Sequence, residues 1–101
     1  MNKQPNPVPI KQVQITNPYV NLLLSKPVFH PEIIDSKKES VLIRMDDQGI
    51  PIQLLNRVEC EIMTAGDKVR RGFASDVRRE GRYLYMTCQW KDPIKEDDSV
   101  H

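Results

Sequence analysis

Hydrophobic and polar residues alternate with a period of two over much of the chain between Ser40 and Trp90. This period places successive side chains on opposite faces of a β-strand, and it differs from the 3.6-residue period of a helix. The alternation is clearest in three runs, whose apolar members are Val41, Ile43 and Met45, then Val58, Cys60 and Ile62, then Leu84, Met86 and Cys88. The pattern predicts half-buried strands around one small core.

Turn sequences separate these runs at short intervals, at residues 46–49, 64–67 and 78–81. The run 50–54 contains Pro51, which cannot donate a hydrogen bond to a ladder, so we expect an edge or bulged strand there. In the run 69–77 we expect Phe73 to face inward and Gly72 to mark a bend. Five short strands predict a mainly β domain over 40–91, a five-stranded antiparallel barrel or bent sheet of the SH3, Sm or OB kind.

Residues 1–39 have a different pattern, which predicts an extended, proline-rich arm. Six of the eight prolines lie within the first 31 residues, where there is no glycine. Each proline removes a backbone donor and favours extended conformations in the residue before it, so this stretch cannot form a long helix. Residues 31–38 alone suit a short helix, with proline in its first turn and lysines at its end. Residues 92–101 are expected to form a charged, frayed tail.

The arm is too apolar to remain in water without cost. Two interpretations stay open: the arm wraps its own domain, or it docks on another subunit or partner. A small core is marginal by itself, which is a further reason to expect the arm to pack somewhere. The side chains expected to dock are Val13, Ile15, Tyr19, Leu22, Leu23 and Phe29.

Residue types that support catalysis or metal binding are scarce in the sequence. It has two histidines, His30 in the arm and His101 at the end of the chain. Cys60 and Cys88 lie on the apolar phase of their strands, which predicts core thiols, and a disulfide would require closure to bring their strands together. There is no CxxC or HxxxH pair and no glycine-rich phosphate loop. We therefore expect no enzymatic activity, no cofactor and no metal site.

Charge is unevenly distributed although the net charge is only +1. Residues 66–91 hold seven basic residues against three acidic ones, and residues 92–101 hold one against four. Arginines beside outward-facing tyrosines suit a protein interface, and they also suit single-stranded nucleic acid, whose phosphates pair with guanidinium groups and whose bases stack on rings. The candidate partner-binding or nucleic-acid-binding residues are Arg70, Arg71, Arg78, Arg79, Arg82, Tyr83 and Tyr85.

Two short segments resemble elements of known families. Asp76-Val77-Arg78-Arg79-Glu80-Gly81 is similar to the DxSxxG element of PilZ domains, which bind cyclic di-GMP; arginine replaces the serine, and no RxxxR motif precedes it. The stretch from Gly66 to Leu84 is similar to a hairpin of Rof, an Sm-like inhibitor of the Rho terminator. The first resemblance implies a cyclic-dinucleotide sensor as a third class of function.

These features together predict a non-enzymatic interaction module. It would be a small regulator, inhibitor or assembly component that docks on a larger protein, or on a second copy of itself, through its arm or an exposed strand edge. The alternative is a small barrel that binds single-stranded RNA or DNA through the basic hairpin at 68–82 with Tyr83 and Tyr85. No apolar run approaches the roughly 18–20 residues of a membrane span, and no signal peptide is recognisable, so we expect a cytoplasmic protein without membrane association.

Overall fold

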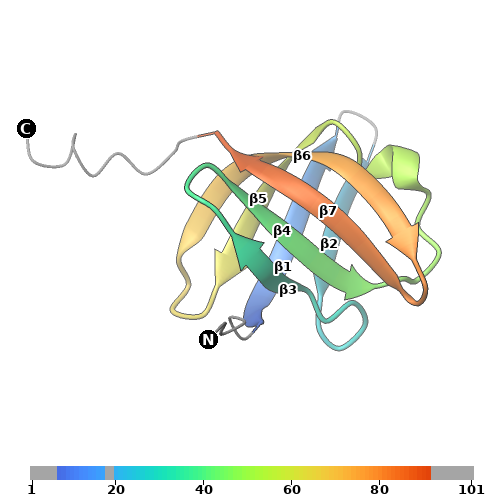
Figure 1. The fold of residues 1–101 in the computed structure, drawn as a ribbon, viewed down its shortest axis with the longest axis horizontal. Helices are drawn as coiled ribbons and strands as arrows, with labels where there is room; N and C mark the ends of the chain where they lie inside the picture. The colour runs from blue at the N-terminus through green and yellow to red at the C-terminus, as the bar shows by residue number, and fades with distance from the viewer. Residues whose placement is uncertain (1–6, 18–19, 92–101) are drawn as a thin grey trace, which may run out of the picture.

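The computed structural model describes residues 7–17 and 20–91, which form seven β-strands and one 3-10 turn (Figure 1). All strand pairings among them are antiparallel. The elements are β1 (Val8–Asn17), β2 (Val20–Ser25), β3 (Glu32–Ser36), β4 (Ser40–Asp46), η1 (Ile52–Leu54), β5 (Val58–Thr64), β6 (Val69–Glu80) and β7 (Tyr83–Trp90). The prediction of a small antiparallel β-barrel is confirmed.

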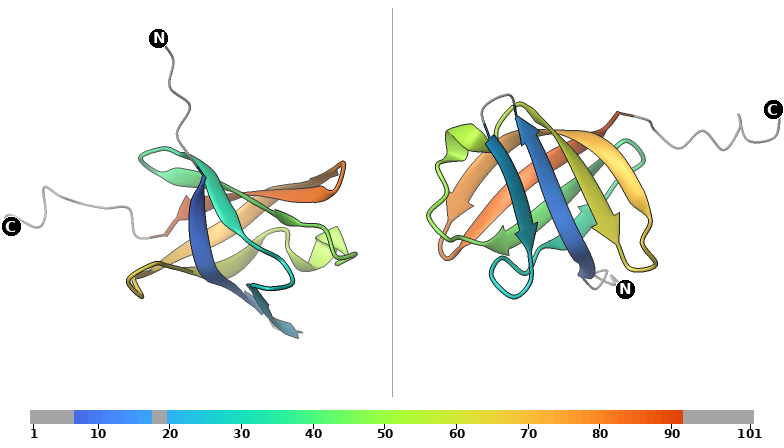
Figure 2. Two further views of the ribbon diagram at one scale, coloured as in Figure 1. Left: turned by 90° about the horizontal axis from the view of Figure 1, so that it is seen from below. Right: turned by 180° about the vertical axis from the view of Figure 1, so that it is seen from behind.

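Six of the strands close the barrel in the order β1-β3-β4-β7-β6-β5, with β5 pairing back to β1. β2 is an additional strand that pairs with β1 on the edge opposite β5, so that β2, β1, β5 and β6 lie side by side at the back of the molecule (Figure 2). On that same edge β1 also pairs with β3, but only through Val8 and Pro9. The expected count of five strands is therefore wrong.

The proline-rich stretch supplies three strands of the fold, and the expectation of an extended arm with a helix at 31–38 is wrong. Ile10, Val13 and Ile15 of β1 are fully buried in the core. β3 forms where the helix was expected, because strand pairing with β1 and β4 satisfies backbone groups that a two-turn helix would leave open. Pro9 lies near the start of β1, where a missing donor is tolerated.

The core lies inside the barrel, and the predicted alternation of buried and partly exposed residues is observed along β4, β5 and β7. The segment 50–54 is not a strand as expected. Pro51 caps the 3-10 turn η1, and this turn places the following Leu55 in the core with no exposed surface. A loop side chain thus helps to fill the interior between the strands.

The phase of β6 differs from the prediction. Gly72 and Ala74 face inward, and Phe73 is 39% exposed on the outer face. The reason is the pair of buried cysteines: the Sγ atoms of Cys60 and Cys88 lie 3.1 Å apart beneath β6. Only small residues leave room above these sulfur atoms, so the large phenyl ring faces outward.

Candidate functional site

The predicted binding residues do not form one continuous surface. Arg70 and Arg71 lie at the start of β6, whereas the others lie around the β6–β7 turn at the far end of this long strand. We call the second region, extended by one arginine from β4, the Arg–Tyr surface. Its members are Arg44, Arg78, Arg82, Tyr83 and Tyr85.

Tyr83 and Tyr85 form the centre of the Arg–Tyr surface. Their ring centroids are 6.4 Å apart with an interplanar angle of 74°, an edge-to-face arrangement. The guanidinium carbon of Arg44 lies 4.7 Å from the Tyr83 ring centroid, and that of Arg78 lies 5.5 Å from the Tyr85 centroid. The two tyrosines are therefore half-buried beneath arginines, and their ring faces are partly covered by this chain's own cations.

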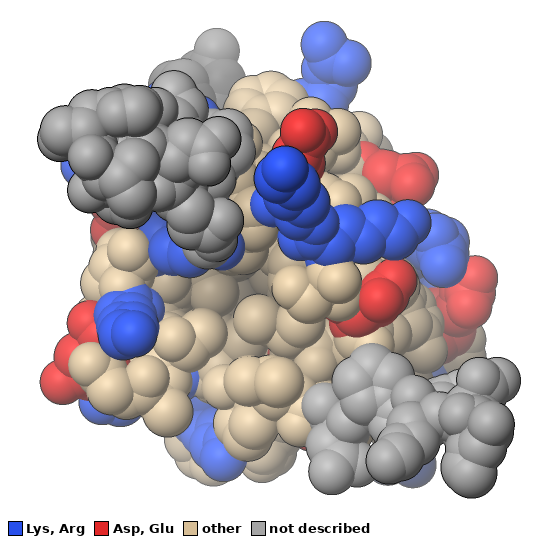
Figure 3. Space-filling model, turned by 60° about the vertical axis from the view of Figure 1, so that its left-hand side comes forward, with Lys and Arg blue, Asp and Glu red and all other residues tan. Residues whose placement is uncertain are grey.

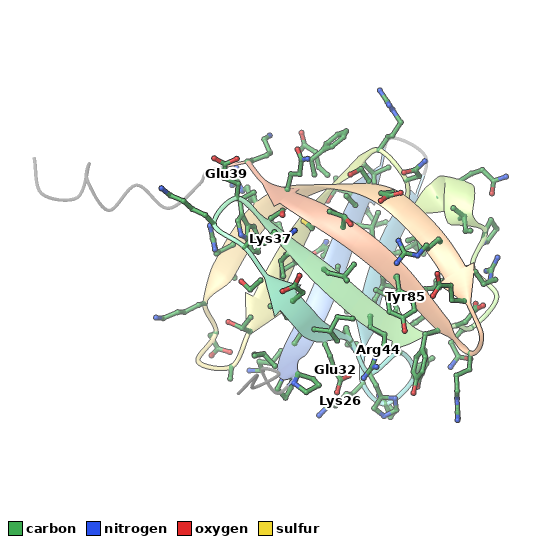
Figure 4. The ribbon with its side chains drawn as sticks, in the orientation of Figure 1. Lys26, Glu32, Lys37, Glu39, Arg44 and Tyr85 are labelled. Carbon is green, nitrogen blue, oxygen red and sulfur yellow. The ribbon has the colours of Figure 1, made fainter. Side chains whose placement is uncertain are left out.

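Arg44 is the member that sequence reasoning missed. It lies on the outward phase of β4, between Ile43 and Met45, and strand register pairs it with Tyr85 on β7. Figure 4 shows Arg44 beside Glu32 and Tyr85, on three neighbouring strands. The alternation in β4 showed that Arg44 faces outward, but its neighbours across the sheet depend on a pairing that the local sequence does not specify.

Carboxylates already neutralise much of the Arg–Tyr surface. Arg44 Nη2 donates to Glu32 Oε1 at 2.8 Å, and this hydrogen bond is the main reason that the pKa of Arg44 is raised above its ordinary value. Arg78 Nε donates to Glu80 Oε2 at 2.9 Å. Arg82 has no ion pair with the part of the chain that the structure describes. Few cations are thus available for phosphate groups without breaking an existing pair.

Arg79 has a structural role beside this surface. Its guanidinium is bound to the Asp47 carboxylate through two nitrogens, and its Nη2 also donates to the carbonyl oxygen of Ile50 at 2.8 Å. Hydrogen bonds from Arg79 and from the backbone N–H of Gly49 lower the pKa of Asp47. Arg79 therefore ties the loop after β4 to the end of β6, and we do not assign it to a binding surface.

The predicted docking residues of the N-terminal stretch separate into two groups. Val13 and Ile15 are fully buried, and Leu22 and Phe29 pack against the same core, so none of these four presents a free docking face. Leu23 is different, because 55% of it is exposed on the outer face of β2. Tyr19 lies outside the described residues.

β2 also leaves a strand edge open. It lies at one end of the sheet order, and no described strand pairs with its outer edge. Its sequence, Val-Asn-Leu-Leu-Leu-Ser, has no charged residue, proline or glycine. Charged residues and proline usually protect an edge strand against pairing with another chain, so this edge is open in both geometry and composition.

Arg70 and Arg71 point to opposite faces of β6. Arg71 faces outward, and its Nε lies 3.5 Å from a carboxylate oxygen of Glu61. Arg70 lies on the inward phase, with its guanidinium carbon 3.8 Å from the ring centroid of Trp90 at the end of β7. The sequence indicated neither this inward direction nor the contact with Trp90, because both follow from the unexpected phase of β6.

The two cysteines are core thiols, as expected. Both are buried, and the hydrogen bond with Cys88 together with burial raises the pKa of the Cys60 thiol. A protonated thiol is a poor nucleophile and a poor metal ligand. Within residues 7–17 and 20–91, no three or more histidine, cysteine, aspartate or glutamate side chains are grouped so that they could hold a metal ion.

A comparison of the chain with protein-family models, with curated proteins and with solved structures finds no match. The described part of the chain contains no helix that is long and apolar enough to cross a membrane.

Proposed function

We propose that the protein is a non-enzymatic interaction module that binds a larger protein by strand addition at β2. The open, uncharged edge of β2 is the observation that carries this proposal. An extended segment of a partner can pair with such an edge through main-chain hydrogen bonds, while side-chain contacts give specificity. Leu23 offers an apolar contact of this second kind on the outer face of the strand.

A partner strand at β2 is favoured because an unpaired edge exposes backbone N–H and C=O groups that pair readily with other chains. Natural sheets usually blunt an edge with lysine, proline, a bulge or a covering loop, since an unprotected edge pairs with other chains. β2 is firmly held on its inner side, where it pairs with β1 from Val20 to Ser25, and its Leu24 is buried in the core. The backbone of β2 is thus already extended and paired on one edge before a partner binds, which lowers the entropic cost of binding.

Substitution of Leu23 by lysine tests the proposal. A lysine there places charge on the outer face of the edge strand and leaves the core unchanged. Phe73→Lys is the matched control, because Phe73 is also an exposed apolar residue, but it lies on β6, which is paired on both edges. Wild-type protein, Leu23→Lys and Phe73→Lys are each immobilised and used to capture proteins that bind them. Each captured protein is then mixed with the wild type, and the rate of amide hydrogen exchange in β2 is measured.

The expected result is a protein that is captured by the wild type and by Phe73→Lys and lost with Leu23→Lys, and that slows exchange of the β2 amides. A dimer of this chain that dissociates on Leu23→Lys would identify a second copy as the partner. A captured protein that is insensitive to Leu23→Lys and leaves β2 exchange unchanged would refute strand addition.

The second candidate is binding of single-stranded nucleic acid at the Arg–Tyr surface. It is supported by the adjacent rings of Tyr83 and Tyr85 with arginines over them. It ranks second because Arg44 and Arg78 are already paired with carboxylates. Fluorescence anisotropy of a labelled oligonucleotide at two salt concentrations separates the two functions: binding through phosphates has a log–log salt slope of about −0.7 per phosphate contacted. No binding at low salt would remove this candidate.

A further inference from the structure

A pocket opens at the end of the barrel formed by the β3–β4 and β5–β6 turns and by the end of β7. Its volume is about 580 Å³. β1 pairs with β3 only through Val8 and Pro9, and no described strand bridges the ends of β3 and β5 beyond that point. In Figure 3, which views this end of the molecule, the surface is hollowed, with uncharged residues on the floor and basic side chains near the rim.

The lining of the pocket combines an apolar wall with basic and hydroxyl groups. Ile33, Ile62 and Trp90 supply apolar surface, and Lys68 and Arg70 supply positive charge. Ser36 and Thr64 add hydroxyl groups. Among the residues that the structure describes, no aspartate or glutamate lines the pocket. A site of this size, mostly apolar and with a few convergent polar groups, is typical of small-molecule binding.

Arg70 is the residue that gives this pocket a specific chemistry. It lies on the inward phase of β6 and stacks on Trp90, and its Nη2 is buried without a hydrogen-bond acceptor among the residues that the structure describes. Burial also lowers the pKa of Arg70, because no described carboxylate compensates the lost hydration. A guanidinium without a counter-ion in a partly apolar setting is costly, and an arriving oxyanion would relieve that cost.

We infer that the pocket binds a small amphipathic anion, whose carboxylate or phosphate head pairs with Arg70 and whose apolar body lies against Ile33, Ile62 and Trp90. The guanidinium fork matches either oxyanion through two parallel hydrogen bonds, and Lys68 adds a second positive charge at the rim. This site lies on the strands β3, β5, β6 and β7, and the proposed partner edge belongs to β2, so the two proposals are independent.

Trp90 allows a direct binding experiment, because it is the single tryptophan of the chain. The full-length protein is titrated with decanoate, decyl phosphate and 1-decanol, and the tryptophan fluorescence is recorded. Decanol has the apolar body without the charge. We expect both anions to change the emission saturably and to bind at least about tenfold more tightly than decanol, because a charge-assisted pair contributes about 1.5–3 kcal/mol. Preference between the two anions identifies the head group.

Two substitutions on the same strand give matched controls. Arg70→Met removes the inward cation, and Arg71→Met removes the outward one from the neighbouring position. Arg70→Met should weaken decanoate binding about tenfold and leave decanol binding within twofold, whereas Arg71→Met should change neither by more than twofold. Arg70→Lys keeps the positive charge but loses the two parallel donors of the guanidinium, so it should bind decanoate with intermediate affinity. If circular dichroism shows that Arg70→Met does not fold, Arg70→Lys replaces it as the test.

Three results would overturn the inference. The first is decanol binding as tight as that of decanoate, which would describe an apolar hollow without anion recognition. The second is equal affinity of wild type, Arg70→Met and Arg70→Lys for decanoate. The third comes from a synthetic peptide of residues 92–101, which carry four acidic residues against one lysine: if this peptide binds in an Arg70-dependent manner more tightly than either small anion, the occupant is the chain's own acidic segment.

Discussion

Replacement of Gly72 by alanine tests the packing that decides the phase of β6. Gly72 lies on the inward side of this strand, directly above the paired sulfur atoms of Cys60 and Cys88. A Cβ at this position would lie 2.2 Å from the Sγ of Cys88 and 3.0 Å from the backbone oxygen of Gln89. The backbone φ of Gly72 is not in the left-handed region, so the substitution introduces a steric effect without strain in φ.

The expected cost follows from that overlap. Ordinary van der Waals contacts of a Cβ lie at 3.4–4 Å, so the sulfur or the strand must move by more than 1 Å. Overpacking of a protein core of this kind costs about 1–3 kcal/mol. Alanine also reduces the entropy of the unfolded chain, which offsets about 0.4–1 kcal/mol. The midpoints of these two ranges leave a net loss of about 1.3 kcal/mol, which corresponds to a fall in Tm of about 5–10 °C for a domain of this size.

Cys88→Ala provides the matched control, because it removes the atom with which the new Cβ collides. Alone it should cost about 1 kcal/mol, as expected for the loss of one buried heavy atom. In the double variant, Gly72→Ala should cost little, which gives a favourable coupling of about 1–3 kcal/mol between the two sites. Urea unfolding monitored by circular dichroism measures the free energy of unfolding of the wild type, the two single variants and the double variant. An unchanged stability of Gly72→Ala, or the same loss with and without the Cys88 thiol, would refute the packing described here.

Three further predictions follow from the fold and its charges. Deletion of residues 1–28 should abolish the strand signal in circular dichroism, because β1 and β2 supply core residues; a folded truncation would show that they are dispensable. Because its pKa is lowered in the folded protein, Asp47 stabilises the fold at any pH above the ordinary carboxyl pKa, and this contribution is lost as the pH falls through the lowered pKa. Asp47→Asn should therefore reduce the free energy of unfolding at pH 7 and flatten its decline in acid. Urea unfolding at several pH values measures both effects, and an unaltered pH profile would contradict the prediction. Treatment of the folded protein with oxidised glutathione should leave Cys60 and Cys88 reduced, because both thiols are buried beneath β6 and thiol–disulfide exchange requires access to the sulfur; a mass loss of two hydrogens would overturn it.

Much of the C-terminal half could be predicted from the sequence, because the relevant physics is local. A period of two in Val41, Ile43 and Met45 assigns both the strand and its buried face. The turn predictions also depend on local backbone sterics: Gly49 and Gly81 both have positive φ, as expected for glycine in tight turns. These features do not depend on which strand lies alongside.

The N-terminal stretch shows where local reasoning stops. Its prolines excluded a long helix, but they did not decide between an arm and a strand, because a strand is stabilised by partners far away in sequence. Ile10 and Val13 are buried only because β5 returns to pair with β1 and closes the barrel. Ile33 likewise belongs to a strand because β4 and β1 flank it.

The candidate sites depend still more on tertiary structure. By hydrophobicity alone Phe73 should face inward, but the sulfur atoms of Cys60 and Cys88 leave no room for a side chain at Gly72, and the small Ala74 fills the next inward position. That choice of phase also turns Arg70 into the barrel end against Trp90. The sequence determined which segments alternate between apolar and polar residues and where the chain turns, since both are set by neighbouring residues. The tertiary structure decided that β2 has an open edge and that Arg70 points inward, because strand order and steric exclusion in a shared core act between residues distant in the chain.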